Sequence, residues 1–287
     1  MNKTKILAII ALAAILLACG DEEGGGAPPS LKKDHLGFIS PFDILEAEFD
    51  SKIVNVNELK LTDISYSTKM ELLNIFDSFD DTLKQLGIKK SDNILYFRGD
   101  SSSKTPGGLH HFAGGINAFI TFKNLKNSDG YRRDSTTLYF STYQILDNLA
   151  GNNDTLTRAV DLETLFSNST QVSFAGVLDH KIGASKFNME DYYKISLRMN
   201  DVLKILAKSN DSLTINITEP GRNSVNKTCG VSSKKETICE LTVGSGHLNL
   251  DDPNEPANKL ADFYIKIYDN KSSAPPNPYT MQISRLR

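Results

Sequence analysis

The second half of the chain contains short runs in which apolar and polar residues alternate. One run places Tyr193, Ile195 and Leu197 at every second position. The same alternation returns in 202–206, 213–217 and 263–267. Alternate side chains of a β-strand share one face, so each run presents one apolar face to an opposing layer. Four such runs, separated by turn-rich segments, predict a β-sandwich.

The first half is also rich in strand-like runs. They cover 42–49, 94–97, 116–122 and 137–140. In the first of them, Leu45, Ala47 and Phe49 fall on one face, and in the last Leu138 and Phe140 do so. This pattern predicts strands of a second sandwich.

One segment of the first half has a helical period instead. Its apolar residues recur at steps of three and four: Leu72, Leu73, Phe76, Phe79, Leu83 and Leu86. Thr68 and Glu71 have the spacing of a capping box, and Gly87 stands where a helix end favours glycine. The pattern predicts one amphipathic helix over 68–87. Such an apolar stripe packs on a sheet or fits a partner's groove, and we expect the former.

These patterns together predict a mostly β protein with two β-sandwich domains. The first domain is expected over 36–143, with the helix packed on its sheet, and the second over 151–287. The length suffices for two domains that each bury a core of their own.

The second half carries an ordered set of landmarks. These are Asn153-Asp154, the run 172–178, Asp191-Tyr192-Tyr193, Asn200-Asp201, the run 212–221, Phe263-Tyr264 and Pro278-Tyr279. Their order resembles the bacterial pre-peptidase C-terminal (PPC) domain, a β-sandwich appended to secreted enzymes and surface proteins. Two features depart from that family: Ala261-Asp262 stands where a glycine is usual, and the segment 220–256 is longer. The resemblance implies a sandwich, and the longer segment is a candidate binding surface.

The segment 40–54 of the first half resembles the opening strands of bacterial immunoglobulin-like domains. A proline there precedes a strand that ends in an acidic turn and a valine. This resemblance implies an immunoglobulin-like sandwich for 36–143 and no chemistry.

The first residues have the organisation of a secretory signal. Lys3 and Lys5 precede an almost wholly apolar run over 6–17, which is too short for a permanent membrane span. The run ends in Leu16-Leu17-Ala18-Cys19. This ending resembles the bacterial lipobox, which implies removal of residues 1–18 and acylation of Cys19. The alternative is an ordinary signal peptide in which the cysteine is incidental.

A lipid on Cys19 would hold the chain on a membrane, since each buried methylene contributes about 0.8 kcal/mol. The segment 19–35 begins with acidic, glycine and proline residues and is expected to be a flexible tether. Gly20 lacks the charge of an inner-membrane retention signal, which favours the outer membrane, although Asp21 to Glu23 reverse that signal in some lineages.

Loss of Lys3 and Lys5 with the signal peptide moves the formal charge from −3 to −5, and the basic residues are scattered along the chain. We therefore expect no nucleic-acid partner.

Two further cysteines, Cys229 and Cys239, lie in the exported part of the chain. A disulfide is the expected state, because a zinc site would need two more soft ligands nearby. So short a loop predicts a pinned hairpin that the bond stabilises by about 2 to 3 kcal/mol.

The PPC resemblance also implies a calcium site. Asn153, Asp154 and Asp191 match the positions that supply oxygen ligands in some members of that family, and calcium prefers such ligands. The alternative is that these residues only form turns. No other cofactor is expected.

The chain lacks recognisable catalytic motifs. It has no Gly-x-Ser-x-Gly elbow, no His-Glu-x-x-His helix and no phosphate-binding glycine loop. His110 and His111 are adjacent, so on a strand they would point to opposite faces, and we expect them in an exposed glycine-rich loop.

We therefore expect a lipid-anchored cell-envelope protein with a non-catalytic role in binding, adhesion or assembly. Its expected partners are the membrane, through the N-terminal lipid, and a protein or polysaccharide ligand. One alternative is a hydrolase of envelope or extracellular polymer, which needs a concave site with converging titratable groups. Another is a structural subunit of a surface complex. A binder should expose an aromatic or apolar patch, expected near Tyr131, His110 or the disulfide loop.

Overall fold

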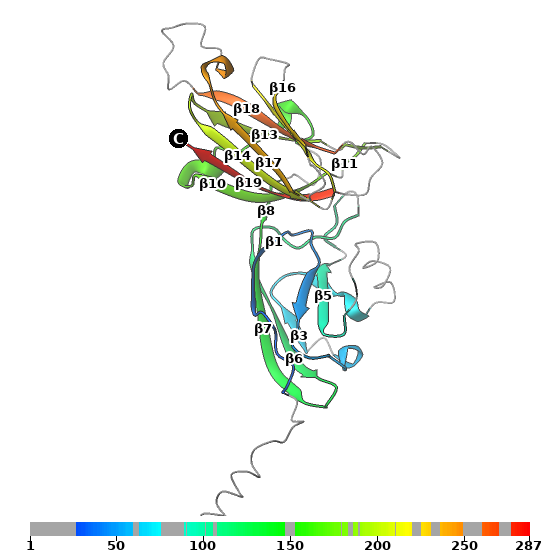
Figure 1. Ribbon diagram of the computed structural model, residues 1–287. Helices are drawn as coiled ribbons and strands as arrows, with labels where there is room; N and C mark the ends of the chain where they lie inside the picture. Colours follow the sequence, from blue (N-terminus) through cyan, green and yellow to red (C-terminus); the bar gives the residue numbers. More distant parts are fainter. Residues whose placement is uncertain are drawn as a thin grey trace, which may run out of the picture.

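The computed structural model gives the arrangement of the chain from residue 27 to residue 287 (Figure 1). The structure describes residues 27–59, 63–75, 89, 91–100, 102–105, 108–146, 153–178, 180–182, 186–188, 190–209, 211–219, 225–230, 236–248, 260–269 and 277–287. Among these residues the fold is mostly β, as predicted. None of the helices in this part of the chain has both the length and the apolar character needed to cross a membrane.

The strands are, in chain order, β1 (His35–Ile39), β2 (Leu45–Glu48), β3 (Ile64–Tyr66), β4 (Met70–Leu72), β5 (Ile94–Gly99), β6 (Asn117–Lys126), β7 (Arg132–Thr142), β8 (Gln144–Ile145), β9 (Val160–Asp161), β10 (Gln171–Leu178), β11 (His180–Ile182), β12 (Lys186–Asn188), β13 (Glu190–Leu197), β14 (Val202–Ser209), β15 (Thr214–Thr218), β16 (Val225–Gly230), β17 (Glu236–Thr242), β18 (Ala261–Tyr268) and β19 (Asn277–Leu286). Short 3-10 helices are η1 (Val56–Glu58), η2 (Leu73–Ile75), η3 (Leu156–Arg158), η4 (Leu165–Asn168) and η5 (Ser245–His247).

The N-terminal region, residues 27–143, has two sheets over one apolar core. A four-stranded sheet has the order β1-β7-β6-β3, and a three-stranded sheet has the order β2-β5-β4. The core receives alternate residues of both sheets, including Ala47, Phe97, Ile120 and Phe140. The strand predictions for this half are confirmed, although β7 is longer than the predicted run 137–140.

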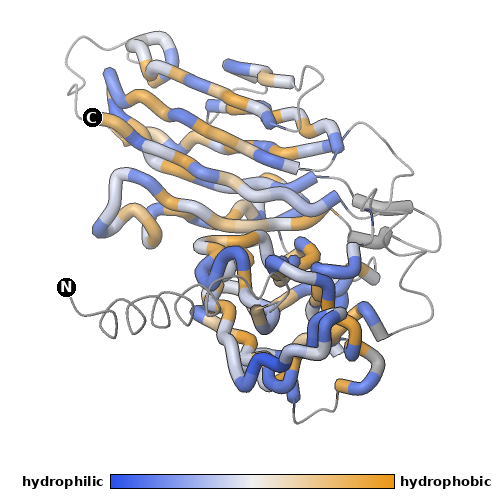
Figure 2. Tube along the Cα trace, turned by 60° about the horizontal axis from the view of Figure 1, so that its bottom comes forward, coloured by the Kyte–Doolittle hydropathy of each residue, from blue (hydrophilic) through white to orange (hydrophobic). Residues whose placement is uncertain are grey.

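The C-terminal region, residues 144–287, has two five-stranded sheets that face each other across a larger core. Their orders are β17-β14-β19-β10-β8 and β16-β15-β18-β13-β9. Tyr193, Ile195, Leu197, Ile215 and Ile265 all point into this core, as the alternation predicted. Figure 2 shows the alternation as successive apolar and polar segments along these strands.

The disulfide between Cys229 and Cys239 is present, with a Cα–Cα distance of 5.6 Å. The prediction that this bond closes a hairpin is wrong. Cys229 lies on β16, which pairs with β15, and Cys239 lies on β17, which pairs with β14 in the other sheet. The bond therefore joins edge strands of the two opposing sheets. Spacing alone did not show that the chain changes sheets between the two cysteines.

The two regions meet without a long linker. Tyr143 donates its backbone N–H to Ile39 O in the N-terminal region, and the next two residues form β8, which pairs with β10 in the C-terminal region. A small apolar cluster of Phe42, Ala175 and Val177 fills the contact. In Figure 1, β8 lies between the two regions, next to the end of β1.

The predicted helix over 68–87 is wrong where the structure describes it. Met70–Leu72 is strand β4, paired with β5, and Leu73–Ile75 is a 3-10 helix. Met70 and Leu72 enter the main core of the region, whereas Leu73 packs with Tyr96 in a separate cluster. Leu72 and Leu73, the first two residues of the predicted stripe, thus pack in different clusters and not along one helical face. Positions 76–87 of the predicted helix lie outside the described residues.

The predicted tether, 19–35, also extends too far. From Ala27 the chain is held on the N-terminal region: Asn127 donates to Ala27 O at 3.0 Å, and Arg133 Nε donates to Pro29 O at 3.0 Å. Leu31 forms a bridge with Phe49. Positions 1–26, including the predicted signal and Cys19, lie outside the described residues.

Candidate binding site

The outer face of the sheet β1-β7-β6-β3 carries a set of aromatic side chains that are exposed or half-buried. We call Phe119, Tyr139, His35, Phe38 and Tyr143 the aromatic strip. Phe38 is 64 % exposed, Tyr139 45 % and Phe119 40 %. These are large values for apolar rings, which usually lie in the core. Their neighbours Ala118, Ile120, Leu138 and Phe140 are buried, so the strip is the solvent side of the same two strands.

Cross-strand register places three of these rings in a row. Tyr139 pairs with Phe119 on one side and with His35 on the other. The ring centroids of His35 and Tyr139 are 4.9 Å apart and stacked, and those of Phe119 and Tyr139 are 6.4 Å apart. The row therefore crosses three neighbouring strands.

A bulge at Gly37 brings Phe38 onto the same face. His35 pairs with Tyr139 and Phe38 with Ser141, so β1 advances three residues where β7 advances two. Gly37 has a φ of +73°, in the left-handed region that favours glycine. Without the extra residue, Phe38 would face away from His35. Its ring instead stacks on Tyr143, with centroids 5.4 Å apart.

Beside Phe38 and Tyr143 lies a groove between the two regions, with a volume of about 630 Å³. We call it the neutral groove. Its N-terminal wall is formed by Phe38, Gly115, Ile116, Asn117, Thr142 and Tyr143, and its C-terminal floor by Gln144, Gln171, Ser173 and Gln282. Among the residues that the structure describes, none that lines this groove is charged. The groove therefore offers aromatic faces together with uncharged donors and acceptors.

A second groove, of about 550 Å³, lies on the other side of the same aromatic pair. It shares Phe38 and Tyr143 with the neutral groove but also contains Asp43, Lys208 and Glu236. Lys208 and Glu236 form an ion pair at 3.8 Å. Desolvation raises the pKa of the Asp43 carboxyl above its usual 3.8. We call this the charged groove.

The predicted calcium residues lie at one end of the C-terminal core. Asn153 and Asp191 are buried, and Asn153 O accepts the backbone N–H of Tyr192. Asp191 Oδ2 accepts a hydrogen bond from Tyr279 Oη at 2.5 Å, and Tyr279 Oη also contacts Tyr193 Oη. No group of three or more His, Cys, Asp and Glu in the described parts of the chain is arranged around a metal. Calcium binding by Asn153, Asp154 and Asp191 stays a prediction.

The two adjacent histidines do not form a site together. His110 Nδ1 contacts Gly99 O at 3.0 Å and Glu71 Oε1 at 3.2 Å, whereas His111 Nδ1 contacts Phe112 O. Burial lowers the pKa of His110. Its side chain is only 13 % exposed, so the expectation of an exposed loop is wrong for this residue.

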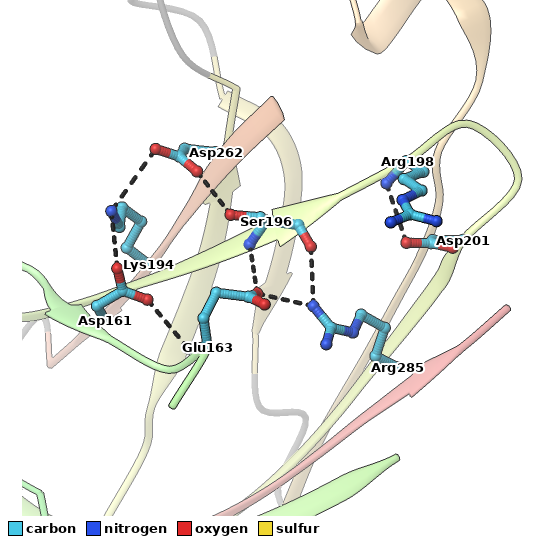
Figure 3. A network of polar contacts seen from close by, with 8 residues as sticks. All are labelled: Asp161, Glu163, Lys194, Ser196, Arg198, Asp201, Asp262 and Arg285. Carbon is cyan, nitrogen blue, oxygen red and sulfur yellow. Dashed lines mark hydrogen bonds and ion pairs between the residues drawn. The ribbon is translucent and has the colours of Figure 1, made fainter. Parts of the chain in front are cut away.

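A polar network in the C-terminal region joins its two sheets (Figure 3). Arg285 on β19 donates to Glu163 Oε1 at 2.7 Å and to Ser196 O at 3.0 Å. On the same side, Lys194 contacts Asp161 at 2.9 Å, and Ser196 Oγ donates to Asp262. Each of the two cations is paired with a carboxylate, and none of these side chains lines either groove named above. This network is therefore a structural tie between the sheets.

The sequence patterns did not indicate the residues of the aromatic strip. The run 116–122 was assigned by its buried face, and its opposite face already contains Phe119 between polar neighbours. An aromatic residue on the otherwise polar face of a strand is the one sequence feature that could have indicated this site. The alignment of Phe119 with Tyr139 depends on the strand register, and the orientation of Phe38 depends on the bulge at Gly37. The sequence pattern shows neither of them.

Of the places where an aromatic or apolar patch is expected, Tyr131 is 40 % exposed and Ile238, beside Cys239, is 71 % exposed, whereas His110 is largely buried. Residues 231–235 of the disulfide loop lie outside the described residues.

Comparisons with known proteins leave the family open. No family model matches the chain, and no curated protein matches it. Similar solved structures include PliG, a periplasmic inhibitor of g-type lysozyme from Aeromonas hydrophila, at 10 % identity and a TM-score of 0.31, covering 45 % of this chain and 96 % of that one. Tripeptidyl peptidase 2 gives 9 % identity and 0.26, covering 88 % and 19 %. The protein SGBP-B of Bacteroides ovatus, solved with a mixed-linkage heptasaccharide, gives 6 % and 0.19, covering 83 % and 52 %.

Proposed function

We propose that this chain is a lipid-anchored cell-envelope protein that binds a ligand, without catalysis, through the aromatic strip and the neutral groove. The exposed aromatic strip is the observation that carries this proposal. Leaving a large apolar side chain in water forgoes roughly 1.5 to 3 kcal/mol of burial free energy. Three such side chains on one face, beside a groove, favour a surface that is covered by a ligand.

The anchor would be the acylated Cys19. Seven residues lie between Cys19 and Ala27, which is held by Asn127, so the two Cα atoms are eight steps and at most about 29 Å apart. Asn127 stands at the turn between β6 and β7, and β7 is 11 residues long, or about 35 Å. The turn end of β7 would thus face the lipid, and the groove at its other end would face away. This arrangement suits capture of a ligand outside the membrane surface.

We further propose that each region is a β-sandwich, immunoglobulin-like in the N-terminal region and PPC-like in the C-terminal region. Two opposed sheets with one core in each region support this reading. An outer-membrane location, proposed from the absence of an acidic residue at Gly20, is tested by separating the two membranes.

The anchor is tested by metabolic labelling with a radioactive fatty acid. We expect label on the wild-type protein and its recovery with membranes, and we expect both to be lost in Cys19→Ala. Cys239→Ala serves as the matched control, because it removes a cysteine without removing the anchor. Membrane recovery of an unlabelled Cys19→Ala protein would contradict the lipid anchor.

Ligand binding is tested by a photoreactive phenylalanine analogue placed at Phe38 or Tyr139 in cells. We expect covalent capture of envelope material at both positions. The matched control is the same analogue at Tyr131, which is 40 % exposed but lies at the opposite end of β7. Equal capture at Tyr131, or no capture at either strip position, would overturn the proposed site.

A further inference from the structure

We propose that the ligand of the neutral groove is a neutral polysaccharide chain. This inference rests on the proposed binding function and adds the chemical class of the ligand. It is carried by three properties of the site: its lack of charge, its exposed ring faces and its amide-rich floor.

The lack of charge excludes ionic ligands. The chain as a whole is 23 % charged, yet the described lining of the neutral groove contains no Asp, Glu, Lys, Arg or His. A phosphate, sulfate or uronate group entering this groove would lose water without gaining a counter-charge, which is unfavourable. The charged side chains near Phe38 lie in the adjoining groove, where Lys208 already pairs with Glu236.

The aromatic pair supplies a flat apolar surface. Phe38 stacks on Tyr143 at an interplanar angle of 27° and remains 64 % exposed, so much of its ring is available to a ligand. A sugar ring presents a face of C–H groups and an edge of hydroxyls. The C–H face matches the negative face of an aromatic ring. The hydroxyl edge requires a polar surface beside that ring.

The floor provides such a surface. Gln171 and Ser173 on β10 lie beside β19, where Gln282 pairs with Ser173. Amide side chains both donate and accept hydrogen bonds, as sugar hydroxyls do. Two amides, Asn117 in the wall and Gln171 in the floor, are oriented by neighbours: Ser141 Oγ donates to Asn117 Oδ1 at 2.7 Å, and Ser284 Oγ donates to Gln171 Oε1 at 3.3 Å.

The extent of the aromatic strip favours a chain over a single sugar. From Tyr143 to Tyr139 the strip runs four residues along the same strand direction, about 13 Å. From His35 to Phe119 it crosses three strands, or roughly 10 Å. Several sugar units are needed to cover both directions, and a polymer that continues past the groove would meet further rings.

The test is affinity electrophoresis of the detergent-solubilised full chain through gels that contain one polysaccharide each. The neutral panel is glucan, mannan, xylan and galactan, and the anionic panel is polygalacturonate and alginate. We expect retardation by at least one neutral polymer and none by the anionic polymers. Phe38→Ala should weaken that binding roughly tenfold or more. Tyr131→Ala, the matched loss of an exposed ring, should leave it unchanged.

A second variant checks the floor without truncation. Gln282→Glu keeps the shape of the side chain but replaces two donors by a charge, and we expect roughly tenfold weaker binding to the neutral polymer. Retardation by no neutral polymer, equal retardation of Phe38→Ala, or preference for anionic polymers would overturn the inference. If photo-capture at Phe38 then identifies a protein, the inference fails and the proposed function stands. If neither assay detects a ligand, both fail.

Discussion

The N-terminal and C-terminal regions place their aromatic side chains differently. In the C-terminal region, Phe174, Tyr193, Phe263 and Tyr279 are at most 1 % exposed. In the N-terminal region, some rings fill the core, but Phe38, Phe119 and Tyr139 remain in solvent. The C-terminal region thus uses its rings for its own stability, whereas the N-terminal region leaves rings available to a ligand.

The outer tyrosines of the C-terminal region support this difference. Lys266 Nζ lies 4.8 Å from the ring centroid of Tyr268 and 5.6 Å from that of Tyr192, and it forms an ion pair with Glu190. These rings therefore already contact a cation of the same chain. No comparable cation covers Phe38 or Tyr139 among the described ring contacts. This contrast supports the proposed location of the ligand site in the N-terminal region and at the junction.

The largest expected loss of stability comes from replacing one closely packed glycine by alanine in each region. An alanine Cβ at Gly99 would overlap the backbone carbonyl of His111, and one at Gly176 would overlap the phenol of Tyr279. Overpacking of this kind destabilises a core by about 3 kcal/mol. In calorimetry we expect Gly99→Ala to lower the melting temperature of the N-terminal region and Gly176→Ala that of the C-terminal region. If each variant lowers a single common transition equally, the two regions unfold as one unit and the comparison loses its basis.

Removal of the disulfide should affect only the C-terminal region. Cys229→Ala/Cys239→Ala releases the tie between β16 and β17 and should lower the unfolding free energy by about 2 to 3 kcal/mol, because the unfolded chain gains entropy. Urea unfolding followed by separate probes in each region measures this. A reductant added to the wild-type chain is the control and should give the same shift. A shift in the N-terminal region would show coupling through the junction.

The core of the C-terminal region was readable from its sequence because each strand has one face in the core and one in solvent. Ile195 and Ile265 lie in the core, as the alternation of apolar and polar residues predicted. The helix predicted over 68–87 is wrong for 68–75, where Met70–Leu72 forms β4 and Leu73 packs against Tyr96 in a separate cluster. The spacing of apolar residues alone does not distinguish residues on one face of a helix from residues that pack in two separate apolar clusters.

The candidate site was not readable for a different reason. Phe119 is visible as an aromatic residue on a polar face, but the neutral groove exists only because β8 joins β10 and brings Gln171 beside Tyr143. That contact is non-local and depends on how two separately patterned regions meet. No motif in either half encodes it. The lipid on Cys19 and the calcium site stay predictions.

A smaller effect is expected from the bulge that positions Phe38. Gly37 has a φ of +73°, and no atom beyond its chain neighbours lies within 4 Å of the place that an alanine Cβ would take. Gly37→Ala therefore meets only the backbone strain of the left-handed region, about 1 to 2 kcal/mol. Gly230→Ala is the matched control, since it also has open space but no positive φ, and we expect a change within roughly 0.5 kcal/mol. Thermal unfolding measures both, and equal effects would mean that Gly37 does not maintain the bulge.

The smallest expected effect distinguishes the electrostatics of the two regions. At Asp43, desolvation raises the pKa above 3.8. At Asp161, desolvation is outweighed by the Glu163 backbone N–H and by Lys194, so the pKa is lowered below 3.8. The same Asp→Asn change should therefore have opposite signs in the two regions.

Asp43 is more easily ionised in the unfolded chain, so its contribution to stability is greatest below pH 3.8 and declines as the pH rises through the raised folded pKa. Asp43 is itself exposed to solvent, which weakens the desolvation, so Asp43→Asn should stabilise at pH 7 by at most roughly 0.5 kcal/mol and lose this advantage in acid. Asp161 contributes above pH 3.8 and loses that contribution as the pH falls through its lowered pKa. Because solvent screens this half-exposed carboxylate, Asp161→Asn should destabilise at pH 7 by only roughly 0.5 kcal/mol. Urea titrations at pH 3 and pH 7 measure both changes, and the same sign for both variants at pH 7 would contradict the opposite environments assigned to these carboxylates.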